Sequence, residues 1–285
     1  MSNIYLNTLA YILQSYKPSN ISLDIPFVQK GDKSLMDKAI SWASNRQTIS
    51  FSPDEPTALR PIFTELEWDT SNSTGVTYYY PFKALSLKEK SAIFPATYKP
   101  TKKDYDELWQ YLIEDLNIAK KSSTTSKTFS ETFTYLLKKH TSQIAASSCT
   151  PYIALFEHLK TSAAIANCLH QFNESNKQEN NQYPLLLCCA DISGIQDFIY
   201  NIASNKAAKS LKGRSFYLVL LMDTIIQKII QELKDYQINT GHLVYASGGK
   251  MFMLLPNLPN VKNKLAEIEE KIIENIYESH KTRLY

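Results

Sequence analysis

Two short apolar runs that flank a Gly-Gly dipeptide constrain the fold of this chain more than any other feature. Residues 242–246 and 251–255 are rich in strand-forming side chains, and only Ser-Gly-Gly-Lys at 247–250 separates them. Glycine reaches the positive φ values that a two-residue turn needs, so the pattern predicts an antiparallel β-hairpin. Five of the seven glycines lie between 194 and 249, so we expect the most tightly specified backbone in this part.

The segments around the hairpin complete the order β-α-α-β-β-α. Residues 183–190 form an apolar run between polar segments, which predicts a central strand buried on both faces. A short helix capped by Ser193 follows, then a longer helix over 215–235 and, after the hairpin, an amphipathic helix over 261–276. This is the βαββα core of a ferredoxin-like sheet without its final segment. We expect another chain or another segment to cover the open edge of the sheet.

The part of the chain before the sheet is predicted to be mostly helical. Helical spacing of apolar residues predicts an amphipathic helix within 1–17 and further helices over 34–45, 104–120, 131–146 and 152–170. The polar tract at 120–130 predicts a mobile loop, and the proline-rich stretch at 71–100 an extended or β-ribbon connector. The fold class is therefore α+β, with an N-terminal mostly helical region over 1–146 and a palm-like domain over 147–285.

Composition places the chain among ordinary globular proteins. Hydrophobic residues make up 44% and charged residues 21% of 285 residues, and the net charge of +3 is too small to indicate nucleic-acid binding by itself. The four cysteines form no CxxC pair, so we expect no zinc site and a reduced, cytoplasmic environment. No signal peptide and no apolar run of membrane-spanning length is present, so no membrane partner is expected.

The predicted layout is that of nucleotide cyclases and polymerase palms, which hold metal ions with carboxylates at the end of the first strand and at the hairpin turn. Asp191 stands at the first position, but the turn offers only Ser247 and Lys250 beside Gly248 and Gly249. One carboxylate makes a poor metal site, so we predict no independent catalysis and no bound metal. Ser247, Gly248, Gly249 and Asp191 could still contact a nucleotide. A plain tight hairpin and a helix-capping acid are the alternatives.

A basic cluster follows the first predicted helix of this region. Lys206, Lys209, Lys212 and Arg214 could contact RNA or nucleotide phosphates, and Arg214 is the best candidate because a guanidinium binds phosphate with two hydrogen bonds. A solvated surface or a subunit contact explains the cluster equally well. For His158 we favour structural hydrogen bonding over a catalytic or metal-binding role, since the sequence shows no ligand set around it.

Three stretches carry a resemblance to a known family, namely FEHLKTSAAIANCL (156–169), DISGIQDFIYNIASNKAAKSLKGRSFYLVLL (191–221) and YASGGKMFMLLPN (245–257). The chain resembles the large signature subunit of type III CRISPR effector complexes, closest to the Csm type, from about residue 57 onward. The resemblance implies a first palm that shares ATP with a second palm carrying a GGDD turn. The pair makes cyclic oligoadenylate when target RNA is bound. Ser247, Gly248 and Gly249 would then line one ATP pocket, and Mg or Mn would enter only with the partner palm.

The same family often has an N-terminal HD domain that cuts single-stranded DNA. This chain contains no His-Asp dipeptide, and Ser44 stands where a metal-binding Asp is expected, so we expect no HD-type DNase activity.

Two functions remain open. In the first, the chain is an ATP-binding half-site of an antiviral ribonucleoprotein, with a GGDD palm, other effector subunits, guide RNA and target RNA as partners. In the second, it is a non-catalytic scaffold that nucleates the guide-RNA complex without nucleotide. The KGRSFYL block argues against a stand-alone signalling cyclase.

Overall fold

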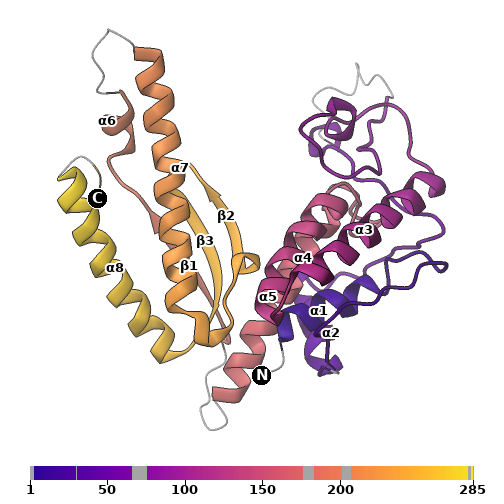
Figure 1. Ribbon diagram of the computed structural model, residues 1–285, viewed down its shortest axis with the longest axis horizontal. Coiled ribbons are helices and arrows are strands. Elements are labelled where there is room, and N and C mark those ends of the chain that lie inside the picture. Colours follow the sequence, from indigo (N-terminus) through magenta and orange to yellow (C-terminus); the bar gives the residue numbers. More distant parts are fainter. Residues whose placement is uncertain are drawn as a thin grey trace. The chain divides into compact units, whose positions relative to one another are not determined.

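A computed structural model describes residues 3–29, 31–65, 76–175, 183–200, 207–281 and 284 (Figure 1). Contacts divide the chain into two compact units, Met1–Ala166 and Asn167–Tyr285, each with its own hydrophobic core. The division falls inside a helix, whereas the sequence placed the boundary at 146/147. Nothing in the described helices combines the length and apolarity that crossing a lipid bilayer demands.

The first unit is helical. Its helices are α1 (Ile4–Leu13), α2 (Lys33–Ala43), α3 (Lys102–Ser122), α4 (Ser126–Thr141) and the first part of α5 (Leu155–Ser175), with short 3₁₀ turns η1 (Ile62–Glu65) and η3 (Lys90–Ala92). The prediction of an amphipathic first helix is wrong in one respect, because nine of the ten residues of α1 are buried. In the described part of the proline-rich connector, pairing is limited to one isolated bridge, Tyr79 to Ala96.

Helix caps explain where α3 and α4 begin. Thr101 and Asp104 form a capping box at the start of α3, and Thr125 accepts a hydrogen bond from the Thr128 amide at the start of α4. The cap at Thr125 lies inside the tract that we expected to be a mobile loop. The loop prediction for 120–130 is wrong for 120–122, which end α3, and for 126–130, which begin α4. At 126–130 a local N-cap outweighs the low complexity of the tract.

The second unit has the predicted order. Its elements are β1 (Leu185–Asp191), α6 (Ile195–Tyr200), α7 (Ala207–Glu232), the 3₁₀ turns η4 (Lys234–Tyr236) and η5 (Thr240–His242), β2 (Leu243–Ser247), β3 (Lys250–Pro256) and α8 (Pro259–His280). The strands form an antiparallel sheet in the order β1-β3-β2, so the α+β class is confirmed. The central strand among those described is β3. The prediction that β1 is central and buried on both faces is wrong for this sheet, since β1 pairs only with β3.

Helices cover one face of this sheet (Figure 1). Met251, Met253 and Leu255 alternate along β3 and are completely buried in a core that also contains residues of α7 and α8. The opposite face has no such cover in the described chain, and Leu187 and Tyr245 there are 58% and 53% exposed. The sheet therefore has a packed face and an open apolar face.

Candidate nucleotide half-site

The hairpin turn is a two-residue loop between β2 and β3. Gly248 has φ +62° and Gly249 φ +82°, and positive φ at both central positions is the signature of a type I′ turn. A Cβ at Gly249 would lie 2.0 Å from Ile195 Cδ1, whereas a Cβ at Gly248 would meet nothing within 4 Å. The Ile192 amide also donates to the Gly249 carbonyl at 2.8 Å. Close packing against α6 thus explains why residue 249 is a glycine. Gly248, in contrast, borders open space.

The sheet register brings the predicted polar residues together. Asp191 at the end of β1 pairs with Lys250 at the start of β3, and Lys250 pairs on its other side with Ser247 at the end of β2. The Lys250 ammonium lies 3.1 Å from Asp191 Oδ2 in an ion pair that is about half exposed. The hydrogen bond to Asp191 raises the pKa of Lys250. Acid, amine and hydroxyl therefore form one row beside the glycine turn.

This row does not fit a divalent metal. Lys250 places an ammonium where a second carboxylate would be needed, and it already occupies Asp191. Within the ranges that the structure describes, no group of three or more His, Cys, Asp or Glu side chains is arranged to hold a metal ion. The Asp191 carboxylate is engaged by Lys250 across the strands, which is not the helix-capping role considered from the sequence.

The basic cluster divides into two kinds of residue. Lys209 and Lys212 are exposed in the first turns of α7, which starts at Ala207 rather than at the predicted 215. Arg214 is half-buried; its Nη1 donates to the Phe198 carbonyl, and its guanidinium carbon lies 5.5 Å from the centre of the Phe198 ring. Arg214 thus fastens α6 to α7. Lys206 lies outside the described residues.

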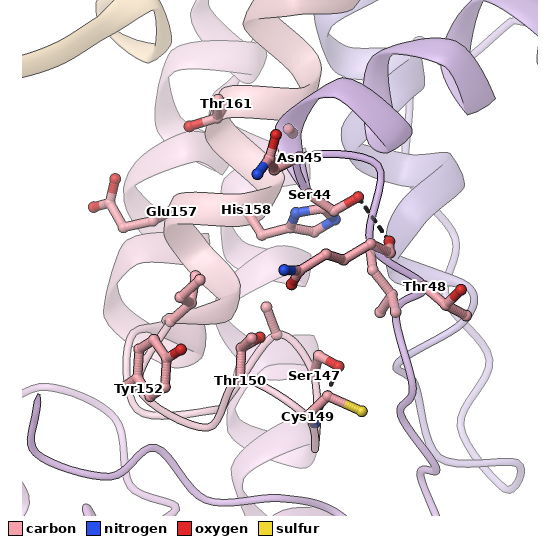
Figure 2. A pocket seen from close by; sticks show the side chains of 15 residues that line it. Ser44, Asn45, Thr48, Ser147, Cys149, Thr150, Tyr152, Glu157, His158 and Thr161 are labelled. Atoms are coloured by element: carbon pink, nitrogen blue, oxygen red, sulfur yellow. Dashed lines mark hydrogen bonds between the residues drawn. The ribbon is translucent and has the colours of Figure 1, made fainter. Parts of the chain in front are cut away.

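A pocket in the first unit was not foreseen from the sequence (Figure 2). It encloses about 340 Å³ between the end of α2, the loop before α5, and the first turns of α5. His158 is 5% exposed, and its Nε2 has no hydrogen-bond partner among the described residues, so hydrogen bonding does not account for this nitrogen. Burial lowers the pKa of His158 to about 4, which leaves the ring neutral.

Ser44 at the rim of this pocket has a local structural role. Its hydroxyl oxygen lies 3.1 Å from the carbonyl oxygen of Ser41 and 3.1 Å from that of Gln47, so its single hydrogen can bond to either and closes the end of α2. The contact with Gln47 is drawn in Figure 2. No local signal could reveal the pocket, because its walls come from residues 43–49 and 146–161, about a hundred positions apart.

A small antiparallel sheet backed by two long helices, with a glycine hairpin beside the acid that ends the first strand, defines a palm-like domain of the cyclase and polymerase class. Residues 184–285 match the family described as Csm1 subunit domain B. This match covers a little over a third of the chain. The chain as a whole is similar to proteins described as Cas10/Csm1 of subtype III-A CRISPR systems.

Two curated relatives carry the description "CRISPR system single-strand-specific deoxyribonuclease Cas10/Csm1 (subtype III-A)". The protein from Enterococcus italicus is 28% identical over 84% of this chain and 32% of its own length. The protein from Mycobacterium tuberculosis is 32% identical over 47% of this chain and 18% of its own length. The chain thus spans at most about a third of the length of these relatives.

Solved structures show the same fold. Csm1 of T. onnurineus is 26% identical, with a TM-score of 0.66 over 88% of this chain and 32% of that protein. A Csm1–Csm4 cassette in complex with AMPPNP is 20% identical, with a TM-score of 0.68 over all of this chain and 44% of that protein. A further Csm1–Csm4 cassette was solved with cA4, at 24% identity and a TM-score of 0.66 over 88% of this chain and 31% of that protein.

Proposed function

We propose that this chain is the first-palm part of a type III CRISPR large subunit in antiviral defence. It would bind ATP at the hairpin and, with a second palm that carries a GGDD turn, support the synthesis of cyclic oligoadenylate. The observation that carries the proposal is the row of Asp191, Lys250 and Ser247 beside a turn that leaves open space at Gly248. The nucleotide-bound Csm1–Csm4 structures support it by likeness of fold.

The residues of the row have complementary roles toward a triphosphate. The Lys250 ammonium is exposed enough to exchange Asp191 for a phosphate oxygen, and a charge-assisted bond to phosphate is stronger than a neutral one. The Ser247 hydroxyl and the Gly248 amide offer further polar contacts at the turn. The open apolar face at Tyr245 suits a flat base or a second palm. Metal ions that activate the attacking hydroxyl would be held by the partner's acids.

The proposed partners follow from the same assignment. Other effector subunits, guide RNA and target RNA would complete a cytoplasmic ribonucleoprotein, and the exposed Lys209 and Lys212 are candidates for phosphate contact. We propose no HD-type DNase activity for this chain, because Ser44 stands where a metal-binding Asp is expected and its hydroxyl caps the end of α2.

Calorimetric titration with ATP tests the half-site. We expect Ser247→Ala to weaken ATP binding about 3-fold to 10-fold and Lys250→Ala about 10-fold or more, as losses of a neutral and a charge-assisted hydrogen bond. Ser215→Ala, which removes an exposed hydroxyl on α7, is the matched control and should bind ATP like the unmodified chain.

A reconstitution separates binding from support of catalysis. The chain is mixed with a GGDD-bearing second palm, ATP, magnesium and a guide–target RNA pair. Oligoadenylate should form only when both proteins are present, and Ser247→Ala should lower the yield. A full yield from the GGDD protein alone would contradict the half-site.

The ion pair itself favours the second candidate function. Because Asp191 already neutralises Lys250, the turn can be stable without any ligand, as a scaffold subunit would require. A scaffold would give no heat with ATP, yet would still assemble with guide RNA and the other subunits.

A further inference from the structure

His158 presents an unsatisfied nitrogen in the pocket between the end of α2 and the start of α5, called here the α2–α5 pocket. The side chain extends from α5 toward the end of α2 and is 5% exposed (Figure 2). Its Nε2 has no hydrogen-bond partner among the described residues. Native structures pair nearly all buried polar atoms with protein, water or ligand, because an unpaired one is costly. A hydrogen-bonding group from outside the chain would therefore stabilise the protein here.

A turn in a costly backbone conformation holds an amide side chain at the rim of this pocket. Asn45 and Arg46 follow α2 with φ +51° and +60°, in the left-handed region that residues with long side chains rarely adopt. The Arg46 amide closes the turn by donating to the Ser41 carbonyl at 2.6 Å. Asn45 lines the pocket, whereas Arg46 does not. The turn therefore places an uncharged amide, and not a cation, at the pocket.

The lining of the pocket has almost no net charge. No lysine or arginine is among the described residues that line it, and burial leaves His158 neutral. Glu157 contributes a carboxylate, but this lies 2.7 Å from the Lys160 ammonium and is already paired. Phosphate groups are bound by cations and strong donors, and one paired carboxylate is a poor metal site. The ligand that fits this pocket is therefore uncharged.

The walls combine apolar surface with a few hydrogen-bonding groups, which is the usual composition of a small-molecule site. Ile49 and Ile153 supply apolar area, and Asn45, Gln47 and His158 supply amide and imidazole groups. A volume of about 340 Å³ has room for one nucleoside. A purine edge carries an N–H donor beside a ring-nitrogen acceptor, which an amide side chain binds with two hydrogen bonds. The same edge suits His158 Nε2 in either neutral tautomer, because it both donates and accepts.

We propose that the α2–α5 pocket binds an uncharged purine nucleoside, whose base is hydrogen-bonded to His158 Nε2 and to the Asn45 amide. The flat faces of the base would lie against the apolar side chains of Ile49 and Ile153, and the ribose would meet hydroxyl groups of the lining such as that of Thr161. The inference concerns the first unit alone. It is independent of the proposed ATP half-site, which lies at the hairpin of the second unit.

Water and a neutral sugar are poorer occupants. A water molecule would satisfy Nε2 but would leave the apolar walls hydrated, which forgoes the hydrophobic gain of burying them. A sugar carries hydroxyl groups around its whole ring, and those facing the isoleucine side chains would lose their hydrogen bonds to water without replacement. A planar base avoids both costs, because its polar atoms lie on its edge and its faces are apolar.

Titration of the full chain with adenosine gives the first test. Binding should be saturable with a Kd of about 0.1 mM. It should move the nitrogen resonance of His158 Nε2 and the amide resonances of residues 43–49 and 146–161. AMP and ATP should bind these residues at least about tenfold more weakly, because the lining offers a phosphate no cation.

Four results would overturn the proposal. Absence of saturable binding up to the solubility limit of adenosine would leave water as the occupant. Ribose that binds as tightly as adenosine would make the site one for sugars, and AMP that binds more tightly would make it one for phosphate. Shifts confined to residues 245–250 would place adenosine at the hairpin instead.

Three variants localise the binding. His158→Phe keeps a flat ring but removes Nε2, and it should weaken adenosine binding about tenfold or more. Asn45→Gly removes the amide, while glycine adopts the positive φ freely, and it should weaken binding about 3-fold to 10-fold. Arg46→Gly is the matched control: it relaxes the same turn but removes a side chain outside the lining, and it should bind adenosine like the unmodified chain.

The two glycine variants decide the question even if His158→Phe fails to fold, because both retain the turn at the end of α2. Equal loss of binding in the two glycine variants would overturn the proposal, since the effect would then come from the turn and not from the Asn45 amide. Full binding by Asn45→Gly, or by a folded His158→Phe variant, would overturn it as well.

Discussion

Replacing Gly249 with alanine tests how the hairpin is held. Both turn glycines have positive φ, and alanine in that conformation costs about 1–2 kcal/mol at either site. At Gly249 the new Cβ would also lie 2.0 Å from Ile195 Cδ1, which must rotate away from a favoured rotamer at about 1 kcal/mol. We therefore expect Gly249→Ala to destabilise the second unit by about 1 kcal/mol more than Gly248→Ala, which meets nothing within 4 Å.

Local free energies of opening, from hydrogen exchange of the β3 amides, measure this difference in the full chain. Ile195→Val removes the clashing methyl group. In a double-mutant cycle it should recover about 1 kcal/mol of the loss caused by Gly249→Ala and nothing of the loss caused by Gly248→Ala. Equal destabilisation by both alanine variants, or no coupling to Ile195, would refute the packing argument.

Three further predictions concern buried and interfacial groups. Burial lowers the pKa of His158 and of His242 to about 4. Between pH 6.5 and pH 4 the unfolded state therefore binds protons that the folded state does not. The free energy of unfolding should be highest above pH 6.5 and lower by about 2 kcal/mol per histidine at pH 5. Urea unfolding at pH 7 and pH 5 measures this, and His158→Phe should reduce the pH dependence of the first unit, to which the buried His140 also contributes, and leave that of the second unchanged. Arg214→Lys should destabilise α6 by about 1 kcal/mol, because lysine lacks the flat guanidinium that lies over Phe198. Lys209→Ala should change the stability of α6 by less than about 0.5 kcal/mol. Hydrogen exchange of the α6 amides measures both effects.

The ion pair of Asp191 and Lys250 determines the local charge at the hairpin, whose turn has no acidic residue. A turn that had merely lost its carboxylate would leave Asp191 as a lone negative charge and a weak attractant for cations. Here the residue that stands in the acid's place cancels that charge directly, 3.1 Å away. The charges of this pair are therefore balanced without a metal, and under the proposed function a phosphate would compete with Asp191 for Lys250.

Local sequence signals predicted most of the second unit. The Gly-Gly turn, the apolar runs beside it and the periodicity of 261–276 each depend on neighbours within a few positions, so the β-α-α-β-β-α order could be read directly. The same signals misjudged α1, because helical spacing of apolar residues does not show whether polar ones such as Asn7 and Thr8 are also buried. The N-cap at Thr125 was overlooked because it lies in a polar tract.

Contacts between distant residues could not be predicted in this way. Arg214 was considered a phosphate ligand, yet it holds the Phe198 carbonyl sixteen positions away. The pocket around His158 joins segments about a hundred residues apart. β1 has the apolar composition of a central strand, but strand order depends on which segments pair, and composition does not specify pairing.

The order of amino acids alone determined that the Ser-Gly-Gly-Lys segment at 247–250 contains no acid and that Asp191 directly follows the apolar run at 183–190. Both are facts of covalent structure and hold for any conformation. Only the tertiary structure decided that Lys250 pairs with that acid and that one edge of β1 has no partner among the described strands, because both depend on register and strand order. Those are set by the simultaneous burial of Met251, Met253 and Leu255 beneath helices from elsewhere in the chain.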